Sequence, residues 1–151
     1  YVIGELGFDA AFNYKTVSSL DVSLNEVCPS GIDVYFENVG GGMLEAVLLQ
    51  LNPYARIVAC GMISQYNLEE PEGVKNLSTM VGNKVKMQGF IVSDHMDLQP
   101  EFFAEMSKWM ANGKIKYRED ITRGVENAPA AFIGMLKGKN FGKQVIQIAN
   151  P

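Results

Sequence analysis

Apolar and polar positions along the chain alternate in two ways, as short β-rich runs and as stripes at helical spacing. The clearest example spans residues 32–67, where an apolar run rich in β-formers is followed by three glycines, an amphipathic segment and a second apolar run at 56–61. This order predicts a strand, a glycine turn, a helix and a second strand. The region is therefore expected to form one βαβ unit of a parallel sheet.

Polar and small residues follow both of these predicted strands. Asn38 and Gly40 come after the first strand, and Gly61, Ser64 and Tyr66 come after the second. In parallel sheets ligands bind outside the carboxyl ends of the strands, where these residues collect. The pattern therefore predicts half of a nucleotide-binding crevice.

The rest of the chain is expected to alternate strands and helices in the same way. Ser18 or Ser19 could begin a helix, because both side chains can accept a backbone hydrogen bond at its start. The other expected elements are a strand at 10–13, a helix at 74–81, a strand at 84–92, a helix whose apolar stripe (102–110) packs into the core, a strand at 114–120, a helix at 128–136 and a closing strand at 142–150. A turn signal and a change of pattern at Asn112 and Gly113 mark the expected domain boundary.

Composition limits the classes of function. A length of 151 residues with 47% hydrophobic and 20% charged residues is typical of a soluble globular protein. The net charge of −4 argues against binding to nucleic acid or to an anionic membrane surface. No apolar run approaches the roughly 20 residues of a transmembrane helix, and no signal peptide is recognisable, so we expect a cytoplasmic protein.

The metal-ligating residue types are few. Cys28 and Cys60 lie in different expected elements without a CxxC pattern, and His95 is the one histidine. This set predicts no metal site. The two thiols are expected to be reduced and mostly buried, and His95 to lie in a loop without a catalytic task.

Five segments together resemble one family. They are NYK at 13–15, ENVGG at 37–41, CGMISQYN at 60–67, GFIV at 89–92 and MLKGKNFGKQVI at 135–146. The chain is similar to the zinc-independent medium-chain dehydrogenases that reduce alkenal and enone double bonds, a group that includes prostaglandin reductases, plant double-bond reductases and bacterial curcumin reductase.

The resemblance implies an architecture. Family members are about twice as long, so the chain is expected to be their carboxyl-terminal half and to be inactive alone. The fold class is then α/β, with residues 1–112 forming the second part of a Rossmann-type doubly wound parallel sheet. Residues 113–151 form a small α+β segment that completes the catalytic domain in relatives. Without the two central strands of the full sheet, the strand at residue 32 would be a bare apolar edge. The isolated chain is therefore expected either to cover this edge by self-association or to be a fragment of a longer protein. A homodimer through the strand at 84–92 is the family arrangement.

The resemblance also assigns roles to residues. Tyr66, in the SxYN pattern, is expected to be catalytic, because a hydroxyl donor stabilises the enolate oxygen that forms when hydride adds to an enone. Asn38 is expected to contact the ribose or carboxamide end of NADPH. The full set of expected cofactor contacts is Tyr14, Asn38, Cys60, Gly61, Met62, Ile63, Ser64, Gln65, Tyr66, Phe90, Ile91, Val92 and Asn140.

The function implied is NADPH-dependent reduction of the carbon–carbon double bond of α,β-unsaturated aldehydes or ketones. Two alternatives stay open at this point. A quinone reductase could use the same scaffold and need not keep the SxYN tyrosine. A non-catalytic dimerisation or binding module is the other alternative, because the chain lacks the glycine-rich turn that binds pyrophosphate.

Overall fold

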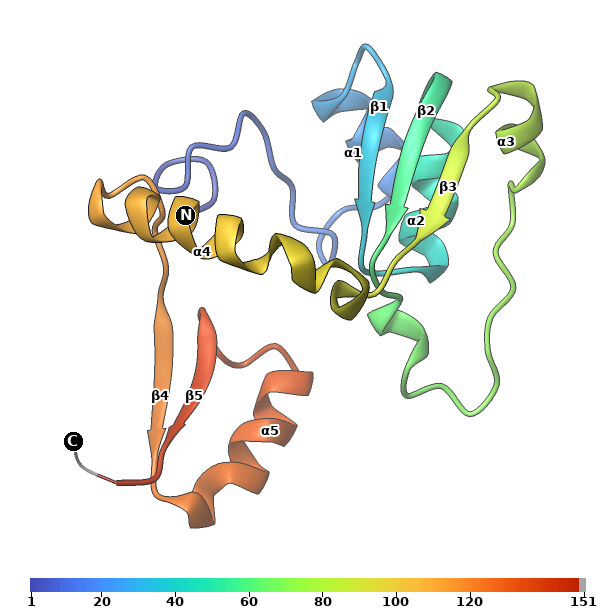
Figure 1. The fold of residues 1–151 in the computed structure, drawn as a ribbon. Helices are drawn as coiled ribbons and strands as arrows, with labels where there is room; N and C mark the ends of the chain where they lie inside the picture. The colour runs from blue at the N-terminus through green and yellow to red at the C-terminus, as the bar shows by residue number, and fades with distance from the viewer. Residues whose placement is uncertain (150–151) are drawn as a thin grey trace. The chain divides into compact units, whose positions relative to one another are not determined.

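The computed structural model describes residues 1–149 and divides the chain into two compact units, Tyr1–Met96 and a second that begins at Asp97 (Figure 1). Each unit contains a parallel sheet and helices. The predicted α/β class with parallel strands is confirmed. The functional division into residues 1–112 and 113–151 stays a prediction.

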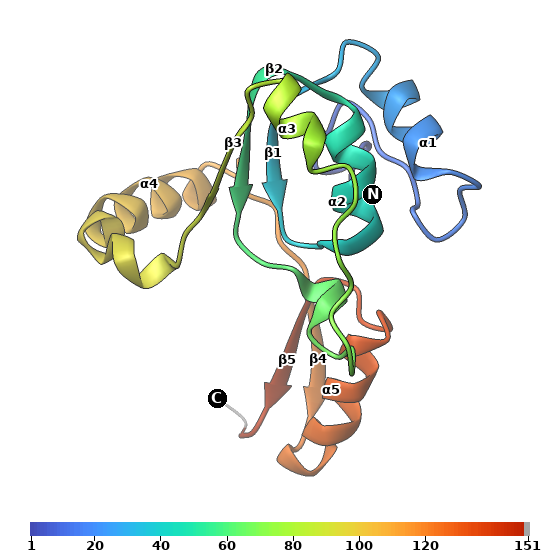
Figure 2. The same cartoon turned by 90° about the vertical axis from the view of Figure 1, so that its right-hand side faces the viewer.

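The first unit is built on a three-stranded sheet of order β1-β2-β3, shown in Figures 1 and 2. Its strands are β1 (Ile32–Glu37), β2 (Leu51–Ala59) and β3 (Lys86–Gly89), and both pairings are parallel. Glu37 pairs with Ala59, and Ala59 pairs with Gly89. The three carboxyl ends are therefore level, so that residues following each strand leave from the same end of the sheet.

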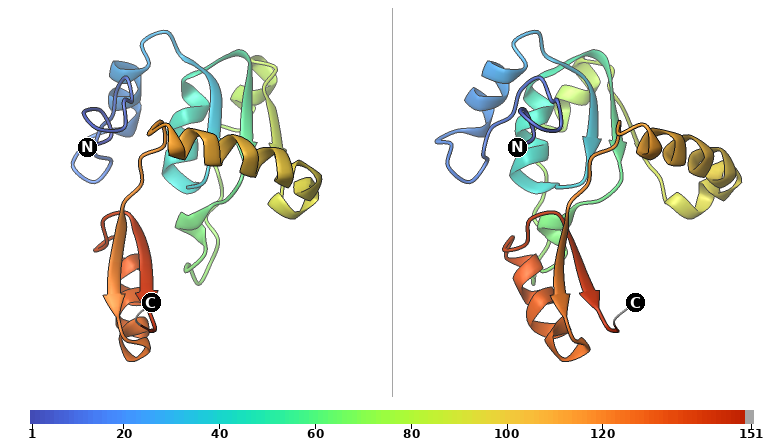
Figure 3. Two further views of the ribbon diagram at one scale, coloured as in Figure 1. Left: turned by 60° about the vertical axis from the view of Figure 1, so that its left-hand side comes forward. Right: turned by 90° about the vertical axis from the view of Figure 1, so that its left-hand side faces the viewer.

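Three helices belong to this unit: α1 (Leu20–Val27), α2 (Gly41–Leu49) and α3 (Ser78–Gly82). Helix α1 begins where Ser19 accepts a hydrogen bond from the backbone N–H of Val22 at 3.4 Å, which settles the choice between the two serines. Helices α1 and α2 lie on the same side of the strands in Figure 3 and pack against each other. Helix α2 thus connects β1 to β2 as the predicted βαβ unit requires.

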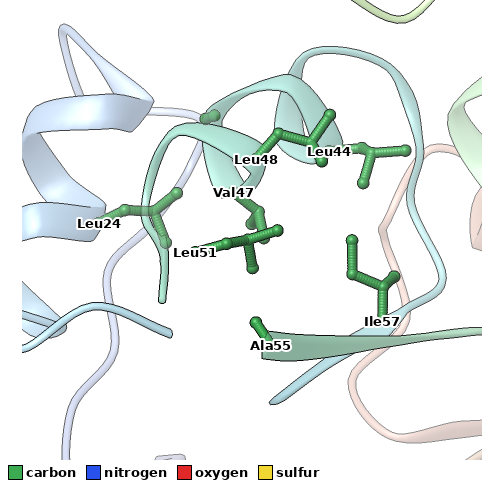
Figure 4. Packing of buried hydrophobic residues seen from close by; sticks show 8 residues of the cluster. Leu24, Leu44, Val47, Leu48, Leu51, Ala55 and Ile57 are labelled. Carbon is green, nitrogen blue, oxygen red and sulfur yellow. The ribbon is translucent and has the colours of Figure 1, made fainter. Parts of the chain in front are cut away.

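The core lies between α2 and β2 (Figure 4). Leu44 and Leu48 of α2 are 1% and 0% exposed, and Ile57 of β2 is 1% exposed. Ala55 and Ile57 alternate with exposed Arg56, as expected for a strand with one covered face. This packing fixes β1 and β2, and hence the loops that follow them.

The opposite face of β1 is open. Val34 and Phe36 are 66% and 57% exposed, and β1 pairs only with β2 in the part of the chain that the structure describes. The prediction that this strand forms an uncovered apolar edge is confirmed for these residues. Such an edge favours pairing with further polypeptide.

The second unit contains a long helix and a small βαβ arrangement. Its elements are α4 (Gln99–Ala111), β4 (Glu119–Arg123), α5 (Ala128–Leu136) and β5 (Lys143–Gln147). Strands β4 and β5 pair in parallel, with Ile121 beside Val145. Asp120 accepts a hydrogen bond from the Phe141 N–H at 3.1 Å, which holds the turn before β5. The closing strand predicted at 142–150 is observed at Lys143–Gln147, and residue 150 lies outside the described residues.

Three expectations of the pattern are wrong. Residues 10–13 form no strand. The sheet of the first unit consists of β1, β2 and β3 within residues 1–96, and none of these strands pairs with residues 10–13. The strand expected at 114–120 lies later, at Glu119–Arg123, where it can pair with β5. The apolar stripe of α4 is not a core face, since Phe102 and Phe103 are more than half exposed and no α4 residue is buried. The stripe has the period of a helix face, but its aromatic side chains are exposed.

Candidate functional site

Glu37 ends β1 with a fully buried carboxylate. The residue is 0% exposed, and its Oε1 atom accepts hydrogen bonds from the N–H groups of Val39 and Gly40, the second at 2.9 Å. The Tyr35 hydroxyl donates to the same oxygen at 3.3 Å. Oε2 is buried and has no hydrogen-bond partner among residues 1–149. The carboxylate therefore stabilises a tight turn directly after the strand.

This first turn is bound to the loop that follows β2. Three successive carbonyl groups of the turn accept hydrogen bonds from four amides of the loop. These are Cys60 N–H and Gly61 N–H to Glu37 O at 2.9 and 3.1 Å, Ile63 N–H to Asn38 O at 2.9 Å, and Ser64 N–H to Val39 O at 3.0 Å. The two strand ends thus form one hydrogen-bonded platform.

Tyr66 sits on this platform after a single 3₁₀ turn, Ile63–Gln65. Its hydroxyl oxygen accepts a hydrogen bond from the Met62 N–H at 3.0 Å. A Cβ placed on Gly61 would lie 2.8 Å from the same oxygen. The side chain is 63% exposed. Because a tyrosine hydroxyl carries one donor and two acceptor positions, accepting from Met62 leaves its proton available to donate.

The Asn38 side chain lies near the same Cβ position of Gly61. Its Oδ1 atom is 3.7 Å from the Cβ position of Gly61, and the residue is exposed. The absence of a side chain at Gly61 therefore keeps open the space between the Asn38 amide and the Tyr66 hydroxyl. An amide and a hydroxyl with a glycine between them can bind a carbonyl, a carboxamide or a ribose hydroxyl.

Glycines allow the close approach of the turn and the loop. Gly40 has φ +75°, and its Cβ would lie 3.0 Å from that of Met62. Gly41 has φ +53°, and its Cβ would lie 3.0 Å from Nε2 of Gln65. The Gln65 side chain in turn accepts from the Glu72 N–H at 3.0 Å, which holds the acidic loop beside the site. Both a positive φ and a close neighbour thus favour glycine at positions 40 and 41.

The predicted residues 90–92 follow β3 and make fewer hydrogen bonds to the platform than residues 60–66 do. The Phe90 N–H donates to Ala59 O at 3.3 Å, so residues 90–92 leave from the same end of the sheet. Phe90 also packs edge-to-face on Phe36, with ring centroids 6.3 Å apart, and lies 6.1 Å from the His95 ring. Ile91 and Val92 are 66% and 74% exposed.

For two further predicted residues the structure gives contacts with their own neighbours along the chain. Tyr14 is 61% exposed in a turn in which Thr16 bonds back to Asn13, and the Lys15 ammonium lies 5.8 Å from its ring. Asn140 belongs to the second unit, where its amide donates to Gly142 O at 2.7 Å. The roles assigned to both residues stay predictions. The thiols are both free, Cys28 half-buried and Cys60 exposed, so the expected burial is wrong for Cys60.

The sequence-based reasoning missed Glu37 and Tyr35. Burial, and then the adjacent Glu37 carboxylate, raises the pKa of the Tyr35 hydroxyl above its ordinary value. A charged residue at the last position of an apolar run, directly before Asn and three glycines, is the signal that could have identified Glu37. A buried acid at that point needs hydrogen-bond donors close by, and the amides of the turn supply them to Oε1.

No group of three or more His, Cys, Asp or Glu side chains within residues 1–149 could hold a metal ion. The described residues therefore do not fit a zinc site.

A hollow of about 300 Å³ lies on the open face of the sheet, lined by Arg56, Ile57, Val58, Lys86 and Gln88. It contains none of the predicted site residues. No helix among the described residues has the length and apolar character needed to cross a membrane.

Two curated proteins are similar to this chain over most of its length. The chain is 47% identical over 145 residues to the 2-alkenal reductase (NADP(+)-dependent) of Nicotiana tabacum, covering 96% of this chain and 42% of that protein. It is 47% identical over 150 residues to the NADPH-dependent curcumin reductase of Escherichia coli, covering 95% of this chain and 43% of that protein. The chain thus spans less than half the length of these relatives.

A solved structure gives the same result in three dimensions. CurA of Vibrio vulnificus in complex with NADPH superimposes with a TM-score of 0.90 at 47% identity, covering 99% of this chain and 46% of CurA. The family model described as zinc-binding dehydrogenase matches residues 6–146. The family predicted from the sequence is confirmed, and the chain belongs to the zinc-binding dehydrogenase family.

Proposed function

We propose that this chain supplies the tyrosine side of the active site of an NADPH-dependent reductase that acts on the carbon–carbon double bond of α,β-unsaturated aldehydes and ketones. One observation carries the proposal: the Tyr66 hydroxyl is held by the Met62 N–H, above Gly61 and beside Asn38, where β1 and β2 end. Relatives named as reductases of alkenals and of curcumin are each 47% identical to this chain, over 145 and 150 residues.

The residues of the platform fit a dinucleotide without a phosphate contact of their own. The amides of Val39 and Gly40 are occupied by the Glu37 carboxylate, so this turn offers a phosphate no ready anion site. Asn38 is exposed instead, next to Gly61, which has no side chain and is partly exposed. These groups suit the uncharged ribose and carboxamide end of NADPH. Residues 60–66 and 90–92 would line that end, and Tyr14 and Asn140 remain proposed contacts elsewhere on the cofactor.

The chemistry assigned to this chain is charge stabilisation. NADPH, when bound, supplies the hydride that adds to the β-carbon of the substrate. The Tyr66 hydroxyl donates to the carbonyl oxygen as negative charge develops there, while its oxygen stays anchored on Met62 N–H. A proton from solvent then adds to the α-carbon, which completes the addition of two hydrogens across the double bond. Such a donor need only be placed before the reaction, and the Met62 contact places it.

The proposal extends to assembly and compartment. The open edge and apolar face of β1, with Val34 and Phe36 exposed, support self-association as a homodimer. Free Cys28 and Cys60 support a reducing compartment such as the cytoplasm.

The test uses two proteins: the 151-residue chain, and a fusion in which the amino-terminal part of the E. coli curcumin reductase precedes this chain. NADPH oxidation by the fusion is followed with an aliphatic enone and, separately, with a quinone. The proposal expects turnover with the enone and saturable NADPH binding. Turnover with the quinone alone would favour a quinone reductase. Absence of NADPH binding by a folded fusion, with the intact curcumin reductase active alongside, would favour a non-catalytic module.

A further inference from the structure

The proposed function uses Tyr66 but gives no task to the most deeply buried charged side chain of the unit. Glu37 is 0% exposed, although it lies at the end of an edge strand. An acid is rarely retained in such a position unless its carboxylate has specific hydrogen-bond donors. The donors here are two consecutive backbone amides and a tyrosine hydroxyl, all on one oxygen atom.

The two amides belong to the same turn whose carbonyl groups hold the Tyr66 loop. The carboxylate of Glu37 binds the N–H groups of Val39 and Gly40, while the carbonyl oxygens of residues 37, 38 and 39 accept from the loop amides of residues 60–64. The donor side of the turn is therefore fixed by the carboxylate, and the acceptor side is fixed by the loop. A shift of the N–H groups bound to Glu37 therefore changes the direction of the carbonyl groups that hold the loop.

The loop transmits this geometry to Tyr66. Gly40 approaches Met62 so closely that a Cβ would lie 3.0 Å from the Met62 Cβ. The Met62 N–H is the donor that anchors the Tyr66 hydroxyl at 3.0 Å. A continuous set of contacts thus runs from the Glu37 carboxylate through Gly40 and Met62 to the phenolic oxygen.

We propose that Glu37 is a positioning residue, whose buried carboxylate sets the turn after β1 and thereby holds the Tyr66 hydroxyl where the substrate carbonyl binds. Glu37 touches neither substrate nor cofactor in this account. The effect on turnover rests on the proposed function, whereas the effect on the loop does not.

The first test needs only the 151-residue chain. Glu37→Gln keeps the size of the side chain but removes its charge, and it places an NH₂ group or a weaker acceptor beside the amides. Charged hydrogen bonds are stronger than neutral ones, so hydrogen exchange at the amides of residues 60–64 is expected to become about ten-fold faster or more. Amides of the β1–β2 ladder at residues 56–59 are expected to change less than about two-fold. Tyr35→Phe, which removes only the phenolic donor, is the matched control and should give a smaller effect.

Two outcomes would overturn the positioning role: unchanged exchange at residues 60–64, or equal acceleration through the whole first unit. If Glu37→Gln does not fold, Glu37→Asp gives the same comparison. Its carboxylate keeps the charge but ends one methylene short of the amides, so the loop should again loosen more than the ladder.

The second test measures coupling to Tyr66 in the fusion protein. Glu37→Gln is expected to lower kcat with the enone by about ten-fold or more while the KM for NADPH changes less than about two-fold. In a Tyr66→Phe background the same substitution should cost less than about three-fold, because residues acting through one group are not additive. Fully additive losses would contradict the positioning role. If Tyr66→Phe alone has no effect, the proposed function fails, and the exchange experiment still decides the role of Glu37.

Discussion

Gly61 offers a way to move the Tyr66 hydroxyl without touching the tyrosine. Gly61 has no positive φ, so an alanine at this position meets no backbone strain, and its only effect is the added Cβ. That Cβ would lie 2.8 Å from the Tyr66 hydroxyl oxygen, whereas an ordinary contact begins at 3.4 Å. The hydroxyl must therefore retreat by about 0.6 Å, a distance that follows from contact radii.

The retreat breaks an anchoring bond rather than the fold. The Met62 N–H to Tyr66 hydroxyl distance is 3.0 Å, and a further shift of this size takes it past the range of a good hydrogen bond. A neutral hydrogen bond contributes about 0.5–1.5 kcal/mol, so the free energy of unfolding should fall by at most about 1.5 kcal/mol. A displaced catalytic group, in contrast, can cost about 10- to 100-fold in rate. Gly61→Ala should therefore be nearly as stable as the wild type and much less active.

The assay is enone-dependent NADPH oxidation by the fusion protein, with thermal unfolding measured on the same samples. Gly82→Ala is the matched control, because a Cβ at Gly82 meets nothing within 4 Å. It should leave kcat unchanged within about two-fold, as expected of a surface substitution that contacts no other group. Wild-type activity in a folded Gly61→Ala variant would refute the placement of the Tyr66 hydroxyl.

Three further predictions test other parts of the structure. Because folding raises the pKa of Tyr35, the residue stays protonated above pH ~10, where the unfolded chain loses its proton. Its contribution to stability is therefore present below about pH 10 and is lost as the pH rises further. In Tyr35→Phe the free energy of unfolding should fall less steeply with alkaline pH than in the wild type, and identical slopes would contradict the raised pKa. Gly142→Ala puts a side chain at φ +96°, with its Cβ 2.2 Å from Arg118 O. The local opening free energy of the β4–β5 pair, measured by hydrogen exchange, should fall by about 2–4 kcal/mol. Gly113→Ala, at φ +67° but with open space around its Cβ, should cost about 1 kcal/mol. Val34→Lys places a charge on the open face of β1 and should shift sedimentation toward the monomer, whereas Val22→Lys, at a similarly exposed position of α1, should not. Association that survives Val34→Lys would exclude this face.

The sequence pattern predicted the central βαβ unit well because its signals are local. The apolar run that begins at Ile32, the glycines after Asn38 and the apolar run at 56–61 each indicate their element without help from distant parts of the chain. Strand β2 nevertheless begins earlier than that second run, at Leu51. The strand ends then follow from topology, which is why Asn38, Gly61 and Tyr66 could be placed together before the structure was known.

The errors arose where an element depends on a partner. Residues 10–13 were predicted as a strand but pair with no neighbouring strand among the described residues, and the α4 stripe has helical period but stays exposed. Neither fact can be read from local pattern. Glu37 was missed for another reason: its burial depends on a hydrogen-bonded turn whose geometry emerges only when Val39 and Gly40 fold back onto it.

The most direct test of the central claim is the rate of enone reduction by the fusion protein carrying Tyr66→Phe, compared with the wild-type fusion. Phenylalanine keeps the ring and removes only the hydroxyl that Met62 anchors. The account predicts that kcat falls by about 10- to 1,000-fold, the range found when one donor to a developing oxyanion is removed, with NADPH binding unchanged. A variant that reduces the enone at the wild-type rate would show that Tyr66 does no more than line the pocket.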